Sequence, residues 1–432
     1  MDQVVVSAGD TAWVLASSAL VLLMTPGLAF FYGGMVRAKS ALNMMMMSMV
    51  TIGVVSVLWV IYGFKLAFGY EANSQWYGSF SLSGLGDVVD ELTNNGGVYP
   101  IPLLVFAAFQ LMFAVITPAL ISGAIADRTK FISWIVFVAI WVTVVYFPVA
   151  HWVFGFGNKE GETVTGAGFL ASRGVQDFAG GTAVHINAGA AALALAIVLG
   201  RRIGWQKSPM RPHSLPLVLL GAGLLWFGWF GFNAGSALGA NNIAGLAFIN
   251  TQVATAGALL GWILTEKIRD GHPTTLGAAS GAVAGLVAIT PACAFVAPWA
   301  AVVIGFIAGV ICALAVGLKY KLGYDDALDV VGVHLVGGII GSLAIGFFGS
   351  SAVNSAGLDG IFYGGGTDLL SKQALGVGLV FAYSFVATLI IGYLIEKTIG
   401  FRLQSEKELI GVDQTEHAES AYEIGGILKG GR

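Results

Sequence analysis

Charged residues are scarce in this chain of 432 residues. They make up 10% of it, hydrophobic residues make up 56%, and the mean hydropathy is +0.82. Ordinary soluble domains carry about 25% charged residues, so this composition excludes such a domain and favours a protein embedded in a lipid bilayer. The net charge of −3 gives no sign of a nucleic-acid partner, and none is expected.

Cysteine is rare and the common catalytic motifs are missing. The two cysteines, Cys293 and Cys312, fall in apolar segments, which indicates small core residues and no disulfide framework. The chain has no HExxH, GxSxG or Walker A motif, and no paired Asn-Pro-Ala boxes of a water channel. Residues 84–87 match the GxGD pattern of intramembrane proteases, but they lie in a polar loop without a second membrane aspartate. We therefore expect neither an enzyme nor a metal or cofactor site.

Long apolar stretches dominate what is present. About 20 apolar residues are needed for a helix to cross a bilayer, and eleven stretches approach or exceed that length. We expect an all-α membrane protein whose transmembrane helices lie at 11–34, 42–68, 99–124, 131–155, 177–200, 215–238, 244–266, 276–296, 300–319, 329–350 and 371–396.

The distribution of lysine and arginine predicts the orientation. With the N-terminus outside, 17 of the 21 basic residues fall on cytoplasmic segments, and the exceptions are Lys65, Lys159, Arg173 and Lys372. The positive-inside rule therefore predicts an external N-terminus and a cytoplasmic C-terminus. Residues 1–10 contain acids but no basic residue, so no cleavable signal peptide is expected.

An odd number of spans predicts an inverted repeat. Spans one to five (about 11–200) and six to ten (about 215–350) make two halves of five helices, which must insert in opposite directions. The eleventh helix, 371–396, completes a transmembrane domain of residues 1–400. Residues 401–432 follow as a charged cytoplasmic tail.

Two histidines in apolar helices are the strongest candidates for a functional site. His185 lies eight residues after Asp177, and His334 lies eight residues after Asp326, in corresponding spans of the two halves. Ionisable residues at membrane depth are costly and usually functional. Eight helical residues rise about 12 Å, so both histidines should arrive near the middle of a core about 30 Å thick.

Structural roles remain open for these residues. The histidines could only pack the bundle through interhelical hydrogen bonds. Asp177 opens a helix and could act as its N-cap, alone or together with a functional role. Capping is the favoured reading for Asp326 and Asp329, which lie at a cytoplasmic helix start.

Several long motifs, in order along nearly the whole chain, resemble the Amt/MEP/Rh ammonium transporter family, and its bacterial Amt branch in particular. The segment 177–187, which contains Asp177 and His185, is one of them. The others are Phe-Phe-Tyr-Gly-Gly at 30–34, Ala-Phe-Gln at 108–110, Gly-Trp-Phe-Gly-Phe-Asn-Ala-Gly-Ser at 228–236, Ile-Thr-Pro-Ala-Cys at 289–293 and Gly-Val-His at 332–334.

The resemblance implies a homotrimer in the plasma membrane, with one pore in each subunit. His185 and His334 would be its twin pore histidines, and Phe109 and Phe232 two stacked rings that gate its outer mouth. The remaining matches are Ser236 and Asp177 in the outer vestibule, and Phe31, Tyr32 and Trp229 along or beside the inner path.

This chain departs from familiar bacterial members at Phe154, where they carry a tryptophan that forms a wall of the cation site. Phenylalanine is a weaker cation–π partner and lacks the indole N–H. The loop 155–174 that follows is also longer and more polar than theirs, and the sequence offers no role for it.

The implied function is transport: ammonium binds at an aromatic and serine vestibule, loses a proton near the gate, and passes the histidines as ammonia. The histidines could also relay the proton. An ammonium sensor with little flux and a neutral-gas channel of Rh type are the alternatives. The tail resembles the family's ordered cytoplasmic tail, which implies a PII-type signal protein as partner, although Ala418 stands where the family usually has glycine.

Overall fold

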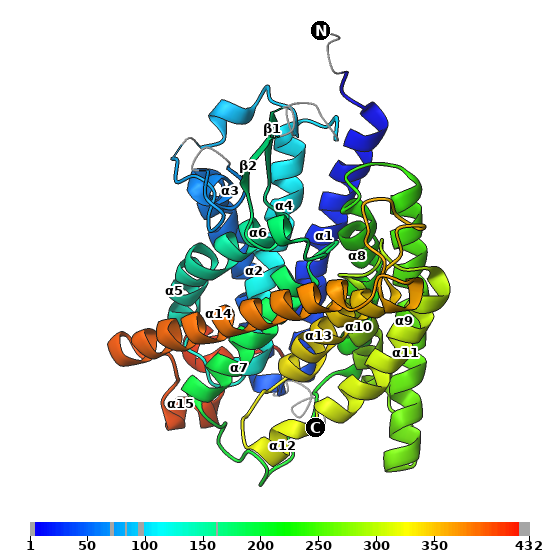
Figure 1. Ribbon diagram of the computed structural model, residues 1–432. Coiled ribbons are helices and arrows are strands. Elements are labelled where there is room, and N and C mark those ends of the chain that lie inside the picture. The colour runs from blue at the N-terminus through cyan, green and yellow to red at the C-terminus, as the bar shows by residue number, and fades with distance from the viewer. Residues whose placement is uncertain (1–4, 70–72, 83, 94–98, 161–162, 423–432) are drawn as a thin grey trace.

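The computed structural model describes residues 5–69, 73–82, 84–93, 99–160 and 163–422, and it is a bundle of helices (Figure 1). The α-helices are α1 Ala8–Met35, α2 Ala41–Leu58, α3 Phe64–Phe68, α4 Leu103–Ile121, α5 Phe131–Trp141, α6 Phe147–Phe154, α7 Asn187–Leu199, α8 Leu215–Gly235, α9 Asn242–Asp270, α10 Thr275–Ile289, α11 Pro298–Ala315, α12 Leu318–Leu322, α13 Val336–Phe348, α14 Asp368–Thr398 and α15 Ser405–Ile410. Wide π-helical turns lie at Trp59–Gly63, Val142–Tyr146, Gly181–Ile186, Val331–Leu335 and Asp413–His417.

The predicted multi-pass helical architecture is confirmed. Within the described residues, ten helical segments are long and apolar enough to cross a membrane, counting each wide turn with the helix that it joins. The eighth predicted span, 276–296, is shorter than expected, because α10 ends at Ile289 and a turn at 290–295 follows. Its fifteen residues fall below the usual spanning length.

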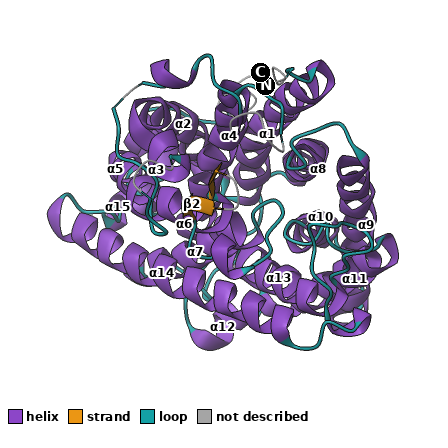
Figure 2. Cartoon of the chain, turned by 45° about the horizontal axis from the view of Figure 1, so that its top comes forward, coloured by secondary structure: helices purple, strands orange, loops and turns teal. Residues whose placement is uncertain are grey.

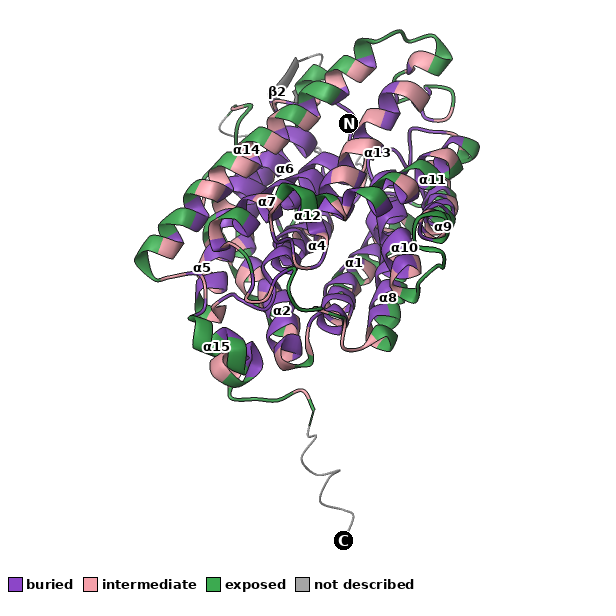
Figure 3. Cartoon of the chain, turned by 90° about the horizontal axis from the view of Figure 1, so that it is seen from below, coloured by how far each residue is buried: buried purple, intermediate pink, exposed green. Residues whose placement is uncertain are grey.

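Close helix contacts explain the abundance of glycine in the spans. A Cβ at Gly261 of α9 would lie 2.5 Å from the Phe306 carbonyl oxygen of α11, and one at Gly341 of α13 would overlap the Ala288 carbonyl of α10. Small residues at such positions let backbones approach closely. The long helix α14 lies across α7 and α13 at the edge of the bundle (Figures 1 and 3), where much of its surface is exposed.

The two ends of the bundle differ in structure. At one, the hairpin end, a two-stranded antiparallel sheet forms from β1 Phe156–Glu160 and β2 Thr163–Ala167 (Figures 1 and 2). The sequence did not predict this hairpin, which occupies the unexplained loop after α6. The opposite end, the tail end, carries α15 and residues 401–422.

Within the described residues, the tail contacts the bundle through acidic side chains that cap two spans. Asp413 accepts hydrogen bonds from the N–H groups of Leu42 (3.0 Å) and Asn43 (2.8 Å) at the start of α2. Glu416 accepts one from the N–H of Phe131 (3.0 Å), the first residue of α5. Carboxylates at helix N-termini are stabilising, so the tail is fastened to the bundle. Residues 423–432 lie outside the described part of the chain.

Candidate functional site

The two predicted histidines meet at the centre of the bundle. The Nδ1 atoms of His185 and His334 lie 3.3 Å apart, and the ring planes differ by 26°. Both side chains are buried, and the Nε2 atom of His185 has no hydrogen-bond partner among the described residues. One Nδ1 must donate and the other accept, so the pair can be joined while both rings stay neutral.

Each histidine is held by the same type of helix start. Three residues after the aspartate, Gly180 and Asp329 both adopt a positive φ, +120° and +65°. A wide turn containing the histidine follows in each half. The expected regular α-helix from the aspartate to the histidine is therefore wrong, because Asp177 and Asp326 bind backbone N–H groups of the wide turns and stand outside the helices.

The two helix starts pack reciprocally. A Cβ on Gly189, four residues after His185, would lie 2.5 Å from the backbone nitrogen of Leu335. A Cβ on Gly338, four residues after His334, would lie 3.0 Å from the side chain of Ile186. Because each glycine has no side chain, it leaves room for the residue that follows the histidine of the other half. This exchange of equivalent contacts is the arrangement expected of two related halves.

Two aromatic rings of the same helix pack against His185. Trp229 and Phe232 of α8 stack on it at centroid distances of 5.4 and 5.9 Å. The ring that meets Phe232 across the bundle is Phe113 of α4, at 4.3 Å. The predicted pair of Phe109 with Phe232 therefore needs correction, because Phe109 lies one helical turn away and packs against Phe113 and beside Gly235.

A small chamber lies on the hairpin side of these rings. Its volume is about 30 Å³, enough for one small ion or water. Phe113, Phe154, Ser236 and Gln110 line it, together with Tyr99, Phe156, Phe178, Ala179 and Leu238. Ser236 donates its hydroxyl hydrogen to the Phe232 carbonyl at 2.8 Å. The lone pairs of its oxygen are therefore left to accept from a donor in the chamber.

A larger depression of about 510 Å³ adjoins the chamber at the hairpin end and shares four lining residues with it. Asp177 lines this depression, but its carboxylate already accepts five hydrogen bonds, from the N–H groups of residues 180–183 and the hydroxyl of Thr182. The predicted capping role of Asp177 is thus present in the structure. Its negative charge lies beside the depression, while its oxygens accept hydrogen bonds from the helix start.

Two more predicted residues lie toward the tail end. Tyr32 is buried and donates its hydroxyl to the Leu120 carbonyl at 3.0 Å. Its ring lies against Gly123, at a point where Val330 also approaches. Phe31 is buried beside it, with ring centroids 5.9 Å apart.

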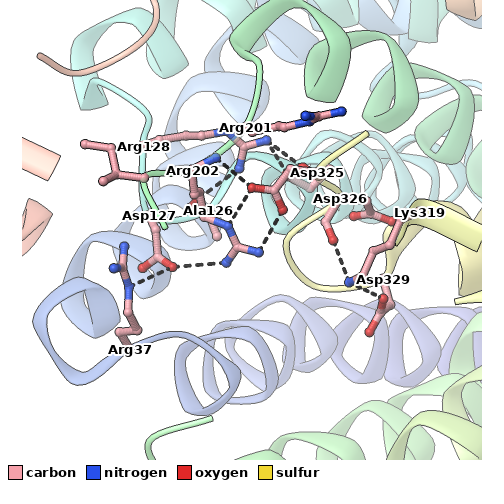
Figure 4. Close-up of polar contacts among 12 residues, drawn as sticks. Arg37, Ala126, Asp127, Arg128, Arg201, Arg202, Lys319, Asp325, Asp326 and Asp329 are labelled. Atoms are coloured by element: carbon pink, nitrogen blue, oxygen red, sulfur yellow. Dashed lines mark hydrogen bonds and ion pairs between the residues drawn. The ribbon is translucent and has the colours of Figure 1, made fainter. Parts of the chain in front are cut away.

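A buried network of ion pairs closes the tail end around the His334 helix start (Figure 4). Asp127 pairs with Arg37 and with Arg202, each at 3.2 Å. Arg202 also binds Asp325 at 2.8 Å, and Lys319 binds Asp329 at 2.6 Å. Breaking one partner of such a buried pair would leave an uncompensated charge, so the network fixes the loops that end four spans.

The network perturbs the ionisation of its members. Burial raises the pKa of the Asp326 carboxyl to about 6, although the charge of Lys319 acts in the opposite direction. Burial also opposes the charge of Asp325, but hydrogen bonds from Arg202 and the charge of Arg128 hold its pKa below the ordinary value. Burial lowers the pKa of Arg128 to about 10, so this guanidinium stays charged at neutral pH.

A depression of about 470 Å³ opens beside this network at the tail end. It is lined by the loop 205–210, by Met35 and Leu328, and by the charged residues Arg202, Lys319 and Asp329. Depressions thus lie at both ends of the bundle, with the buried histidine pair between them. Among the described residues, no cluster of His, Cys, Asp and Glu is arranged to hold a metal.

Sequence reasoning missed four aromatic residues of the chamber. Phe113 follows the quoted Ala-Phe-Gln motif by three residues, and the helical period of α4 was the signal that could have selected it. Tyr99 and Phe178 lie at the starts of two predicted spans, and Phe178 belongs to the quoted segment 177–187, but neither was selected as a site residue. Phe156 belongs to the unpredicted hairpin.

Comparison with known proteins agrees with this geometry. A family model described as Ammonium Transporter Family matches residues 12–422. The "Ammonium transporter" of Mycobacterium tuberculosis strain H37Rv is 57% identical over 434 residues, covering 96% of this chain and 90% of that protein. The crystal structure of the S453D mutant of Candida albicans Mep2 is 35% identical with a TM-score of 0.85, covering 93% of this chain and 89% of that one.

A solved structure named "Sensor Amt Protein" is 30% identical, with a TM-score of 0.84, and covers 95% of this chain and 98% of that chain. The matches span nearly the whole chain and agree with the helical membrane fold. They also agree with the expectation that the protein is not an enzyme. The chain is a multi-pass membrane protein that belongs to the ammonium transporter family.

Proposed function

We propose that this protein takes up ammonium through the plasma membrane by recruiting the cation at the hairpin end and conducting ammonia past the histidine pair. The single observation that carries the proposal is the alignment of the small chamber, the Phe113–Phe232 contact and the paired histidines. A cation site, a barrier and a polar relay thus follow one another.

Recognition in the chamber would combine one acceptor with aromatic walls. The Ser236 oxygen accepts a hydrogen bond from ammonium, and the faces of Phe113 and Phe154 replace part of its hydration. A cation–π contact contributes about 0.5–2 kcal/mol. Neighbouring Asp177 adds a negative charge, since its carboxylate borders the larger depression.

The buried rings beyond the chamber favour deprotonation before passage. Moving a bare cation into a low-dielectric interior costs several kcal/mol even after relaxation, whereas ammonia is neutral and crosses more easily. His185 and His334 can donate to and accept from ammonia, and the free Nε2 of His185 offers one such site. The released proton returns to the vestibule or is relayed along the histidine pair.

The test is an ammonium concentration series in liposomes that hold the purified protein, with currents recorded on supported membranes. Restoring tryptophan by Phe154→Trp should tighten apparent binding by up to about tenfold, which corresponds to about 1.4 kcal/mol. Ser236→Ala should weaken it, and the maximal rate should change less in both cases. Three superimposable curves would remove the vestibule as a recognition site and favour the neutral-gas channel.

A sensor with little flux is the second candidate, supported by the similarity to the protein named Sensor Amt. The same liposome experiment separates the two candidates. A sensor would bind ammonium with saturation but give no sustained uptake, whereas a transporter gives both. If the wild-type protein binds ammonium but does not transport it, sensing replaces uptake as the supported function.

We propose further that the hairpin end is extracellular and the tail end cytoplasmic, in a homotrimer of eleven-span subunits. The two native cysteines are buried, so single cysteines introduced at Lys159 and at Lys407 can be labelled selectively. They should react from opposite sides of an intact membrane. Labelling of both from outside would contradict the orientation and the inverted repeat, and native mass measurement in mild detergent tests the trimer.

A PII-type signal protein is the proposed partner at the tail end. The support is the ordered tail and the depression lined by Arg202 and the loop 205–210. Deleting residues 404–432 should weaken co-purification of such a protein and change the flux. Failure to recover a PII protein with the full-length chain from cells at low nitrogen demand would count against this partner.

A further inference from the structure

The hairpin after α6 carries an aromatic residue into the vestibule. Gly155 ends α6, and Phe156 is the first residue of β1, paired with Ala167 across the ladder. The base is closed by a hydrogen bond of 2.7 Å from the Gly168 N–H to the Gly155 carbonyl. Phe156 is therefore fixed where the strand leaves the end of the helix.

Further contacts hold the returning strand to the neighbouring loop. The N–H of Gly166 donates to the Asn73 side-chain oxygen at 2.9 Å. The N–H of Phe169 donates to the Gln75 carbonyl, and that of Leu170 to the Trp152 carbonyl, both at 2.9 Å. These bonds tie the hairpin to the loop before α4 and to α6, so the position of Phe156 does not depend on the hairpin alone.

Phe156 borders both the small chamber and the larger depression. Only Tyr99, Phe178 and Ser236 share this position with it among the described lining residues. The side chain of Phe156 is 50% exposed, whereas that of Phe154, in the same chamber, is 7% exposed. Phe156 therefore lies at the rim of these spaces, whereas Phe154 belongs to the buried wall of the chamber.

We propose that Phe156 is a cation-binding residue of the vestibule, through which the hairpin sets the apparent affinity for ammonium. The inference rests on the proposed function and extends it to a residue outside the spans. A ring at the boundary of the two spaces would meet the cation as it sheds water, because Phe156 lines both spaces together with Ser236. Cation–π attraction acts on the bound cation and leaves the buried gate and histidines unchanged.

The experiment measures ammonium uptake against concentration in liposomes containing the full chain. Phe156→Leu fills similar space without a π face, Phe156→Ala removes the bulk, and Phe156→Trp strengthens the π face. Phe362→Ala is the matched control, because Phe362 is also largely exposed (61%) but lines neither space. The alanine and leucine variants should raise the half-saturating concentration by about threefold to tenfold. Maximal rates should stay within about twofold of the wild-type value, and tryptophan should match or lower the wild-type half-saturation.

A leucine variant with the wild-type curve would overturn the proposal, because the π face would then be irrelevant. An equal loss in Phe362→Ala would also overturn it, since the effect would be a general one. If Phe156→Ala does not fold, the leucine and tryptophan variants decide the question. Failure of the wild-type protein to take up ammonium would contradict the proposed function itself, which is a distinguishable result.

Discussion

The hairpin end and the tail end use one device in two different surroundings. In both, an aspartate, a positive φ and a wide turn position a histidine. Asp177 has five hydrogen-bond donors and borders an open depression, whereas the Asp326 oxygens accept from two backbone N–H groups. The pKa of the Asp326 carboxyl is raised to about 6 by burial. The two aspartates thus have the same backbone role, while the surroundings of their charges differ.

The largest expected effect comes from removing the feature that the two halves share. Replacing both histidines, by His185→Ala with His334→Ala, should abolish saturable ammonia flux or convert it into cation leakage. The interior of the bundle would then lose the polar pair that lies between its two depressions. Uptake and supported-membrane currents measure both outcomes. If the double variant takes up ammonium at the wild-type rate and still excludes methylammonium, the histidine pair is only a packing contact.

The two aspartates should differ in their contribution to stability. Asp177→Asn should lower the free energy of unfolding by about 3 kcal/mol, because hydrogen bonds to a charged acceptor contribute about 1.5–3 kcal/mol and are not additive. Asp326→Asn should lower it far less or raise it, because only two N–H donors are involved and burial makes the charge of this carboxylate unfavourable at pH 7.5. Thermal unfolding in detergent at pH 7.5 compares the two variants. Equal losses of stability would contradict the expected difference between the two aspartates.

The pH dependence of the second variant sharpens this contrast. The pKa of Asp326 in the folded protein, about 6, exceeds its ordinary value of 3.8. The folded state therefore binds this proton more tightly, and stability from this carboxyl is lost as the pH rises from about 4 to 6. The stability of the wild-type protein minus that of Asp326→Asn should fall over this range and then level off. A difference that stays constant from pH 4 to 7 would contradict the raised pKa.

The smallest effect concerns the tail, which covers only one end. Ala418 has a φ of +56°, a left-handed conformation that costs a residue with a Cβ about 1–2 kcal/mol. Ala418→Gly should therefore stabilise the docked tail by up to about 1 kcal/mol, since glycine adopts this conformation freely but is more mobile when undocked. Hydrogen exchange at residues 405–417 measures the effect, and faster exchange in the variant would contradict it.

Much of this architecture could be predicted from the sequence, because apolar run length and histidines at membrane depth are strong local signals. The motifs also selected His185 and His334, which are in contact, and Phe154 and Ser236, which line the same small chamber. The wide turns could not be predicted, since the choice between an α-turn and a wide turn depends on where Asp177 and Asp326 bind the backbone.

The vestibule was predicted less well than the histidine pair. Phe109 and Phe113 lie four residues apart on one face of α4, so only the packing of α8 distinguishes the ring that meets Phe232. Phe156 is placed by strand pairing in a short polar segment, where no hydrophobic alternation marks a strand. Contacts between distant segments decided these positions.

The wide turns also make the orientation of each histidine depend on the number of residues in the turn. A wide turn holds one residue more than an α-turn, and each residue advances a helix by about 100°. A deletion of one residue within 181–186 or 331–335 would restore ordinary winding and turn the histidine by that angle relative to its helix start. The protein should therefore accept many substitutions in these two turns more readily than a single change in their number of residues.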